Sequence, residues 1–88
     1  SNIRQLAAEL APQGITANSI RAGVTATPAA QKIPNYEEFS QQAARRNPHR
    51  RLTTTEDVAR AIVVLSHPDT YRMTGNVIGV DGGEEIVG

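Results

Sequence analysis

The chain has 88 residues, nine basic and nine acidic side chains, and no cysteine. Zero formal charge offers no broad basic surface for nucleic acid or membrane lipid, and the missing cysteines exclude disulfides and thiolate metal sites. His49 and His67 are far apart in sequence, so a histidine-based metal site is not expected either. Without a long apolar run or a basic-then-apolar leader, we expect a cytoplasmic protein with no membrane or nucleic-acid partner.

The first part of the chain predicts a helix followed by a strand. Apolar residues recur at helical spacing over residues 1–12, and Gly14 can adopt the left-handed conformation that ends a helix. Residues 15–20 are short, partly β-branched and free of proline and glycine, which favours a strand. Arg21, Ala22 and Gly23 are then expected to leave this strand as a loop.

The segment from Arg21 to Thr27 is the first candidate for a binding site. In open parallel sheets, ligands bind outside the carboxyl ends of the strands, and this loop follows such an end. A plain turn, in which Gly23 serves only the backbone geometry, explains the same residues equally well.

The second part of the chain predicts an irregular excursion, a helix and a strand. Prolines punctuate residues 24–53, which contain one short helix over Tyr36 to Arg46. Thr54 can cap a further helix that ends at Ser66, with Asp57 completing a shortened capping box. The apolar face of this helix comprises Val58, Ala61, Ile62 and Leu65. Residues 76–80 form the last expected strand.

The order of helix, strand, excursion, helix and strand favours parallel pairing of the two strands through a right-handed crossover. Two parallel strands alone leave both edges unpaired, and these strands carry apolar residues on both faces. We therefore expect the sequence to be one part of a larger α/β domain.

Four groups of residues, in this order, resemble the carboxyl-terminal part of a short-chain dehydrogenase/reductase. They are LAAELAPQGI at 6–15; Asn18 with Ile20, Gly23 and Thr27; RL at 51–52 before TEDVA at 55–59; and TGNVI at 74–78 running into VDGG at 80–83. The resemblance implies that residues 1–88 belong to one doubly wound, Rossmann-like reductase domain. It also implies that residues 24–53 are the excursion that closes over the substrate.

The same resemblance implies a cofactor, NADP or NAD, beside the first loop. Its cofactor-binding residues would be Ala22, Gly23, Val24, Thr25 and Thr27, with the backbone of Thr25 and the hydroxyl of Thr27 meeting the nicotinamide carboxamide. Ala22 stands where the family usually has proline, which implies a less rigid loop. The catalytic serine and the tyrosine–lysine pair are expected before Ser1, so the 88 residues alone are predicted to be inactive.

The excursion supplies the candidate substrate residues, which are Ala30, Ile33, Tyr36 and Phe39. Alternatively, Ile33 and Phe39 only anchor the excursion to the body of the protein. Arg45, Arg46 and Arg50 are candidates for binding an acyl carrier protein or its phosphopantetheine, and the alternative is a solvated helix face. Arg51 matches a position with a structural role, and Glu84 and Glu85 are expected to be solvated.

Within the family, the sequence looks closest to the reductases that act on acyl carrier protein thioesters in fatty-acid synthesis. Enoyl reduction is the first hypothesis and 3-oxoacyl reduction the second, in a homodimer or homotetramer. A non-catalytic fragment or oligomerisation module of the same fold, without cofactor, is the alternative from a different class.

Overall fold

The computed structural model describes residues 2–87, which form an elongated body of 48 × 24 × 22 Å. No helix in this range combines the length and the apolar character that crossing a membrane requires. The helices and strands are α1 (Asn2–Leu10), β1 (Ser19–Ala22), α2 (Pro28–Gln31), α3 (Tyr36–Arg46), α4 (Thr55–Leu65) and β2 (Val77–Val80), and three short 3-10 helices are η1 (Ala11–Gln13), η2 (Pro68–Thr70) and η3 (Glu84–Val87).

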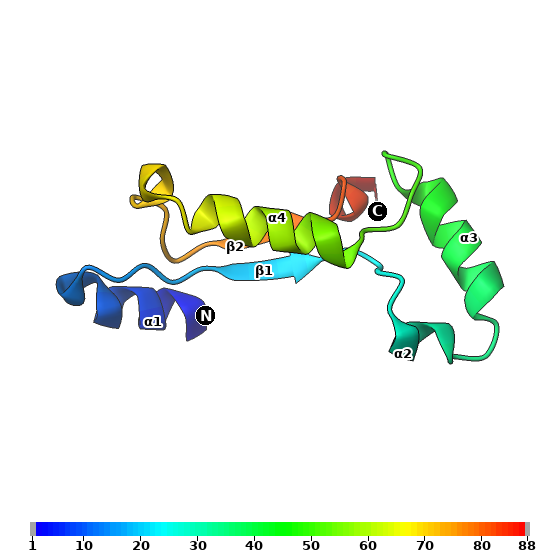
Figure 1. Cartoon of the computed structure of the whole chain (residues 1–88), viewed down its shortest axis with the longest axis horizontal. Helices are drawn as coiled ribbons and strands as arrows, with labels where there is room; N and C mark the ends of the chain where they lie inside the picture. Colours follow the sequence, from blue (N-terminus) through cyan, green and yellow to red (C-terminus); the bar gives the residue numbers. More distant parts are fainter. Residues whose placement is uncertain (1, 88) are drawn as a thin grey trace.

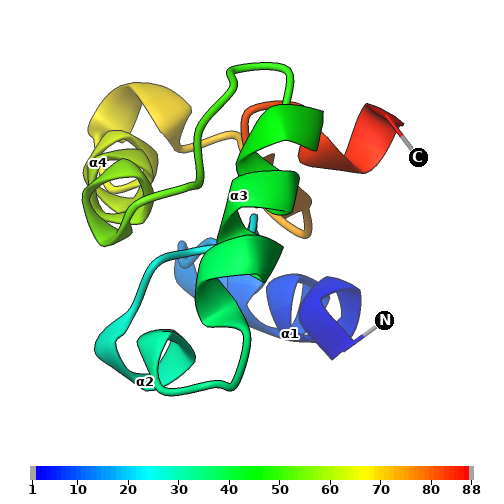
Figure 2. The ribbon, with the colours of Figure 1, turned by 90° about the vertical axis from the view of Figure 1, so that its right-hand side faces the viewer.

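The two strands pair in parallel, as predicted. Ser19 lies opposite Val77 and Ala22 opposite Val80. Helices α1 and α4 lie on opposite sides of this pair, which gives a small α/β/α arrangement (Figures 1 and 2). The excursion with α2 and α3 extends beyond the carboxyl ends of the strands (Figure 1). That end of the molecule therefore carries the segments expected to form a binding site.

The boundaries of α3 and α4 agree with the sequence-based prediction. Thr54 caps α4 by accepting a hydrogen bond from Asp57 N, and the Asp57 carboxylate accepts one from Thr54 N, so the capping box is complete. The first helix ends at Leu10, earlier than predicted, and the tighter turn η1, which contains Pro12, begins at Ala11. Gly14 closes this turn with a φ of 77°, in the left-handed conformation predicted for it.

The predicted position of the first strand is wrong. The strand lies at residues 19–22, and 15–18 precede it, so Arg21 and Ala22 belong to the sheet and not to the loop. The strand starts at Ser19, whose N–H donates to Asn76 O at 2.8 Å, after a first backbone bond from Gly75 N to Ala17 O at 2.7 Å. Just before it, the Ala17 backbone N–H binds the Thr74 hydroxyl instead. Tertiary pairing, and not β propensity, sets this boundary.

The short helix α2 was not predicted. Its cap is Thr27, whose Oγ1 accepts a hydrogen bond from Ala30 N at 3.1 Å, and Pro28 occupies the first turn. Both residue types are favoured at these positions, so the pair Thr27-Pro28 was an available signal.

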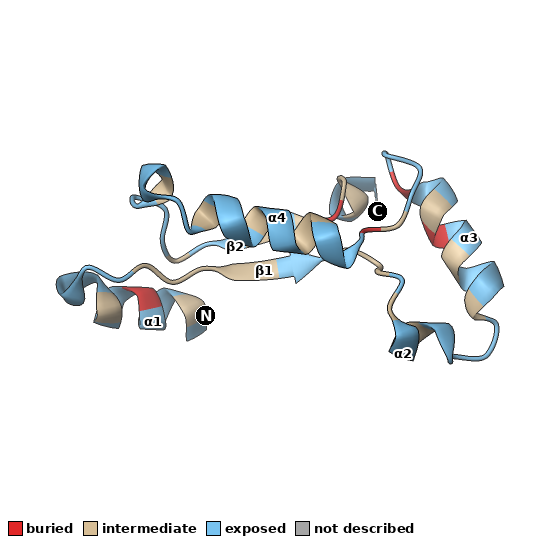
Figure 3. Ribbon diagram, in the orientation of Figure 1, coloured by how far each residue is buried: buried red, intermediate tan, exposed pale blue. Residues whose placement is uncertain are grey.

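Little apolar surface is buried within the described residues, and the buried residues lie mainly at one end (Figure 3). Ala7 and Ala43 are the buried apolar residues of this range. By contrast, Ile62, Val63 and Val77 expose 51%, 71% and 55% of their surface. Three polar residues are buried where the strands end, and these are Asn47, Thr53 and Asp81.

Candidate functional site

The loop that leaves β1 is packed tightly at Gly23. Its N–H donates to Val80 O at 3.2 Å, which extends the pairing of the two strands by one residue. A Cβ at position 23 would lie 2.6 Å from Thr53 Oγ1 and 2.9 Å from Asp81 Cβ. Glycine is therefore required here because three segments meet, and the predicted turn geometry is secondary.

Both backbone polar groups of Val24 are occupied. Its carbonyl accepts a hydrogen bond from Thr53 N at 3.0 Å, and its N–H donates to Glu84 Oε1 at 3.2 Å. The segment before α4 thus holds one side of the loop, and the segment after β2 holds the other. Glu84 was expected to be solvated, and that expectation is wrong.

Thr25 presents one free donor and one free acceptor. It forms an isolated parallel bridge with Thr53, and the hydrogen bond beside this bridge runs from Thr53 N to the preceding Val24 O and not to Thr25. The N–H and C=O of Thr25 itself therefore face away from Thr53, and neither has a hydrogen-bond partner within residues 2–87. The Thr25 hydroxyl is turned inward and donates to Gly23 O at 2.7 Å.

The remaining predicted cofactor residues lie in different surroundings. Thr27 caps α2 with an Oγ1 lone pair, which leaves the hydroxyl proton able to donate elsewhere. Ala22 ends β1 opposite Val80, within the sheet. The structure thus places Val24, Thr25 and Thr27 along one exit segment and Ala22 just before it.

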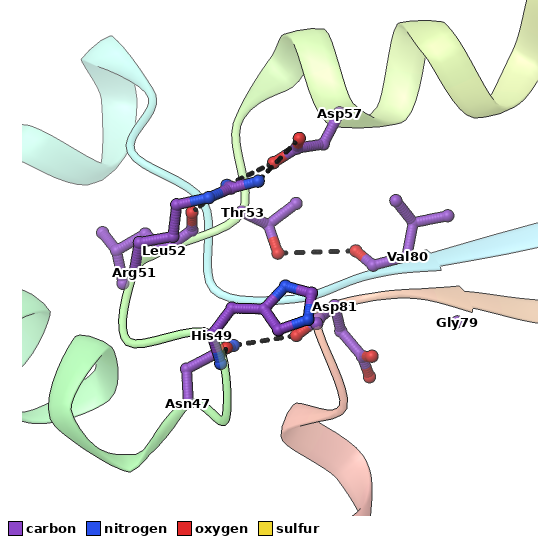
Figure 4. A pocket seen from close by; sticks show the side chains of 10 residues that line it. Asn47, His49, Arg51, Leu52, Thr53, Asp57, Gly79, Val80 and Asp81 are labelled. Atoms are coloured by element: carbon purple, nitrogen blue, oxygen red, sulfur yellow. Dashed lines mark hydrogen bonds and ion pairs between the residues drawn. The ribbon is translucent and has the colours of Figure 1, made fainter.

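A second group of polar contacts, centred on Asn47, lies next to this loop at the end of β2. Asn47 is buried, with 2% of its surface exposed to solvent. Its Nδ2 donates to Asp81 O at 2.8 Å, and its Oδ1 accepts from His49 N at 2.8 Å (Figure 4). These residues line a cavity of about 260 Å³ at the end of β2. Sequence reasoning missed Asn47, because only its three-dimensional position distinguishes it from other loop asparagines.

Arg51 and Asp57 form a bidentate ion pair on the rim of the same cavity. Arg51 NH1 lies 2.6 Å from Asp57 Oδ2, and NH2 lies 3.0 Å from Oδ1 (Figure 4). The hydrogen bond from Arg51 lowers the pKa of Asp57 below its ordinary value, assisted by Thr54 N–H. The pKa of Arg51 is raised by the same bond. Arg51 therefore has the structural role that was predicted for it.

Asp81 joins the two strand ends to the residues that follow β2. Its carboxylate accepts hydrogen bonds from Gly83 N at 2.9 Å and from Arg21 at 3.4 Å. The Gly83 N–H bond is the main reason that the pKa of Asp81 is lowered, and Arg21 contributes further. Arg21 also pairs with Glu85 at 3.3 Å.

The predicted substrate residues are spread along the excursion, and none of them lines the cavity described above. Ala30 and Tyr36 are half-buried, whereas Ile33 and Phe39 are 60% and 51% exposed. Neither of the latter two is buried against residues 2–87, so the anchoring alternative finds no support in this range.

The three candidate arginines do not form one cluster in the structure. The guanidinium of Arg50 donates to Arg45 O at 2.6 Å, which joins these two residues at the end of α3. Arg46 instead lines a cavity of about 310 Å³ with Val24, Ala43, Glu84 and Val87. This cavity beside Val24 therefore has an arginine and a glutamate in its walls.

Comparison with known proteins agrees with this architecture. Residues 1–85 match a family model described as enoyl-(acyl carrier protein) reductase. The chain is 38% identical to the 3-oxoacyl-[acyl-carrier-protein] reductase FabG of Thermotoga maritima over 88% of its length, covering 30% of that relative. It is 33% identical to the NADH-dependent enoyl-[acyl-carrier-protein] reductase FabI of Escherichia coli over 98% of its length, covering 33% of that protein.

A solved structure of ElxO with NADPH bound matches 97% of the chain at 32% identity with a TM-score of 0.79, over 35% of the ElxO chain. The sequence thus spans about a third of the length of these proteins. The likeness confirms the expected fold, a portion of a doubly wound parallel sheet. The chain belongs to the short-chain dehydrogenase/reductase family, and its matching family model is that of the enoyl-(acyl carrier protein) reductases.

Proposed function

We propose that these residues are the carboxyl-terminal third of an NAD(P)H-dependent short-chain reductase of the cytoplasm, and that Val24 to Thr27 orient the nicotinamide ring. The observation that carries this proposal is the free N–H and C=O of Thr25 at the carboxyl end of β1. A carboxamide has both a donor and an acceptor, so it can bind this pair with two hydrogen bonds. The Thr27 hydroxyl can donate a third.

The bound nicotinamide would supply hydride, and this chain's residues would fix which ring face delivers it. Because Val24 is held at both its N–H and its C=O, the adjacent peptide of Thr25 is restrained before the cofactor arrives. Such preorganisation reduces the ordering that binding requires. The catalytic proton donor is expected in the part of the protein that precedes Ser1.

We propose an enoyl thioester as the substrate, in fatty-acid synthesis, since the family model and the E. coli relative both carry the enoyl reductase description. Hydride would then add to the β-carbon of the enone. The T. maritima relative supports the second candidate, a 3-oxoacyl thioester, in which hydride adds to the ketone carbon. Comparing turnover of a crotonyl and an acetoacetyl thioester distinguishes the two.

The excursion over residues 24–53 is proposed to close over the acyl chain, with Ala30, Ile33, Tyr36 and Phe39 as lining residues. Closure would exclude water from the hydride transfer, and the exposed Ile33 and Phe39 would then be covered by substrate. We further propose that Arg45, Arg46 and Arg50 meet an acyl carrier protein, and that the enzyme is a homodimer or homotetramer.

Cofactor titration of the full-length protein tests the proposed site. ADP-ribose contains the adenosine and both phosphates of the cofactor but no nicotinamide, so it separates loss of the carboxamide contact from general damage. Thr27→Val should weaken binding of NADH or NADPH and leave ADP-ribose binding unchanged. Thr27→Ser, which keeps the hydroxyl and the helix cap, should bind like the unchanged protein. Equal cofactor binding by the valine and serine variants would remove Thr27 from the site.

A non-catalytic oligomerisation module remains the second candidate, because Ile62, Val63 and Val77 present an exposed apolar surface over α4 and β2. This candidate predicts that the full-length protein self-associates and binds neither NADH nor NADPH. Tight binding of either cofactor would exclude it.

A further inference from the structure

The residues after β2 reach back to the proposed nicotinamide loop at one point. Gly82 and Gly83, with φ of 64° and 89°, reverse the chain immediately after the strand. Asp81 fixes this reversal, since its carboxylate accepts from Gly83 N and its carbonyl accepts from Glu84 N at 3.2 Å. The reversal directs Glu84 toward the loop, where its Oε1 accepts the hydrogen bond from Val24 N at 3.2 Å.

This contact is distinct from the surface ion pairs of the same segment. Glu84 is half-buried and lines the 310 Å³ cavity together with Val24 and Arg46. The neighbouring Glu85 has a 65% exposed side chain, and its carboxylate pairs with Arg21 instead. The two glutamates therefore carry the same charge in adjacent positions, and only Glu84 bonds to the loop.

We propose that Glu84 is a positioning residue for the nicotinamide site, an inference that rests on the proposed function. Its carboxylate fixes the N–H of Val24 while Thr53 N fixes the C=O of the same residue. With both groups held, the backbone on either side of Val24 is fixed, and the Val24–Thr25 peptide, which carries the Thr25 N–H, keeps its orientation. Glu84 itself touches neither cofactor nor substrate in this arrangement.

The test compares variants of the full-length protein by fluorescence titration with NADH and NADPH. Glu84→Ala removes the acceptor and should weaken binding of the preferred cofactor about tenfold, the size expected for a hydrogen bond to a charged group. Binding of ADP-ribose should stay unchanged, because that probe lacks the nicotinamide. Glu84→Gln keeps an acceptor oxygen and should restore most of the affinity.

Glu85→Ala is the matched control, since it removes the same charge from the next residue and breaks only an exposed ion pair. It should bind cofactor like the unchanged protein. An equal loss in Glu84→Ala and Glu85→Ala, or a loss for ADP-ribose as large as for NADPH, would overturn the positioning role. So would unchanged cofactor binding by Glu84→Ala.

The outcome for the unchanged protein separates this inference from the proposed function. If the unchanged protein binds neither NADH nor NADPH, the proposed function fails and the role of Glu84 fails with it. If the unchanged protein binds cofactor and Glu84→Ala binds it equally well, only the role of Glu84 is wrong.

Discussion

Two regions of this molecule, the carboxyl ends of the strands and the helices, are stabilised by different kinds of contact. Where the strands end, the buried residues are polar, and hydrogen bonds join three segments that are far apart in sequence. Along the helices, contacts are apolar and sparse, with Ala7 buried on α1 and with Ile62 and Val63 of α4 largely exposed (Figure 3). The shape of the candidate site is therefore set by contacts inside this chain, whereas little apolar burial supports the body around it.

This difference implies that the contacts that fix the geometry of the site are not those that supply most of the folding free energy. Hydrogen bonds contribute little net free energy, yet they penalise alternative arrangements because a buried polar group without a partner is costly. Apolar burial supplies most of the stabilising free energy of a folded domain. We therefore expect substitutions at the strand ends to alter the geometry of the site. We expect the overall stability to depend on covering the apolar residues that are exposed in this structure, such as Ile62, Val63 and Val77.

The largest expected effect concerns the 88 residues as an isolated polypeptide. With two apolar residues buried within the described range, apolar burial cannot offset the conformational entropy of ordering the chain. We expect no cooperative thermal transition by circular dichroism and no measurable binding of NADPH. A sharp two-state melt of this polypeptide would show that the sparse apolar contacts are sufficient.

The next largest effect is expected at Gly23. Gly23→Ala places a methyl group against Thr53 and the Asp81 backbone, which cannot move independently. We expect a loss of about 1–3 kcal/mol in the unfolding free energy of the full-length protein, together with weaker cofactor binding.

Gly79→Ala is the control for this prediction. Its added Cβ would come close only to the end of the flexible Arg21 side chain, with Asp81 Oδ2 at an ordinary contact distance of 3.5 Å, so urea unfolding should show a smaller loss, that of the exposed Arg21 ion pairs. Equal losses in the two variants would mean that the contact with Thr53 and Asp81 is unimportant.

Removal of the buried amide should have an intermediate effect. Asn47→Ala removes one of the two hydrogen bonds that Asp81 O accepts and leaves the His49 N–H without its partner, at an expected cost of about 1–3 kcal/mol. Asn47→Asp should not rescue stability, because it replaces the donor with an oxygen that faces another oxygen. Gln41→Ala, an exposed amide on α3, is the control and should stay within about 0.5 kcal/mol by urea unfolding. Rescue by aspartate would contradict the role of the Nδ2 donor.

The smallest effect concerns the pH dependence of the Arg51–Asp57 pair. The pKa of Asp57 is lower in the folded protein than in the unfolded chain, so its contribution is complete above about pH 4, the ordinary aspartate range. The contribution is lost as the pH falls toward the folded pKa. The stability difference between the unchanged protein and Asp57→Asn should therefore shrink between pH 7 and pH 3.

Glu56→Gln, which breaks the exposed pair between Glu56 and Arg60, is the matched change on the same helix. Its effect should be small at both pH values. A stability difference for Asp57→Asn that is the same at pH 7 and pH 3 would contradict the assignment of this ion pair.

The sequence predicted the elements whose signals are local. Helix α4 has its capping residues next to its apolar face, so its two ends were correct. The start of β1 was misplaced, because hydrogen bonds from residues 74–76 decide where pairing begins. Thr25 and Thr27 were named as candidates through the family resemblance, and their role stays a prediction. Asn47 and Glu84 were not, since their roles depend on partners more than thirty positions away and no local pattern marks them.

The pairing of Arg21 with Gly79 across the two strands has a consequence for sequence variation. A Cβ at position 79 would lie 2.6 Å from an Arg21 guanidinium nitrogen, so a side chain there would push the arginine away from Asp81 and Glu85. Positions 21 and 79 should therefore covary among relatives. Arginine at the first should accompany glycine at the second, and a larger residue at position 79 should accompany a shorter or uncharged one at position 21.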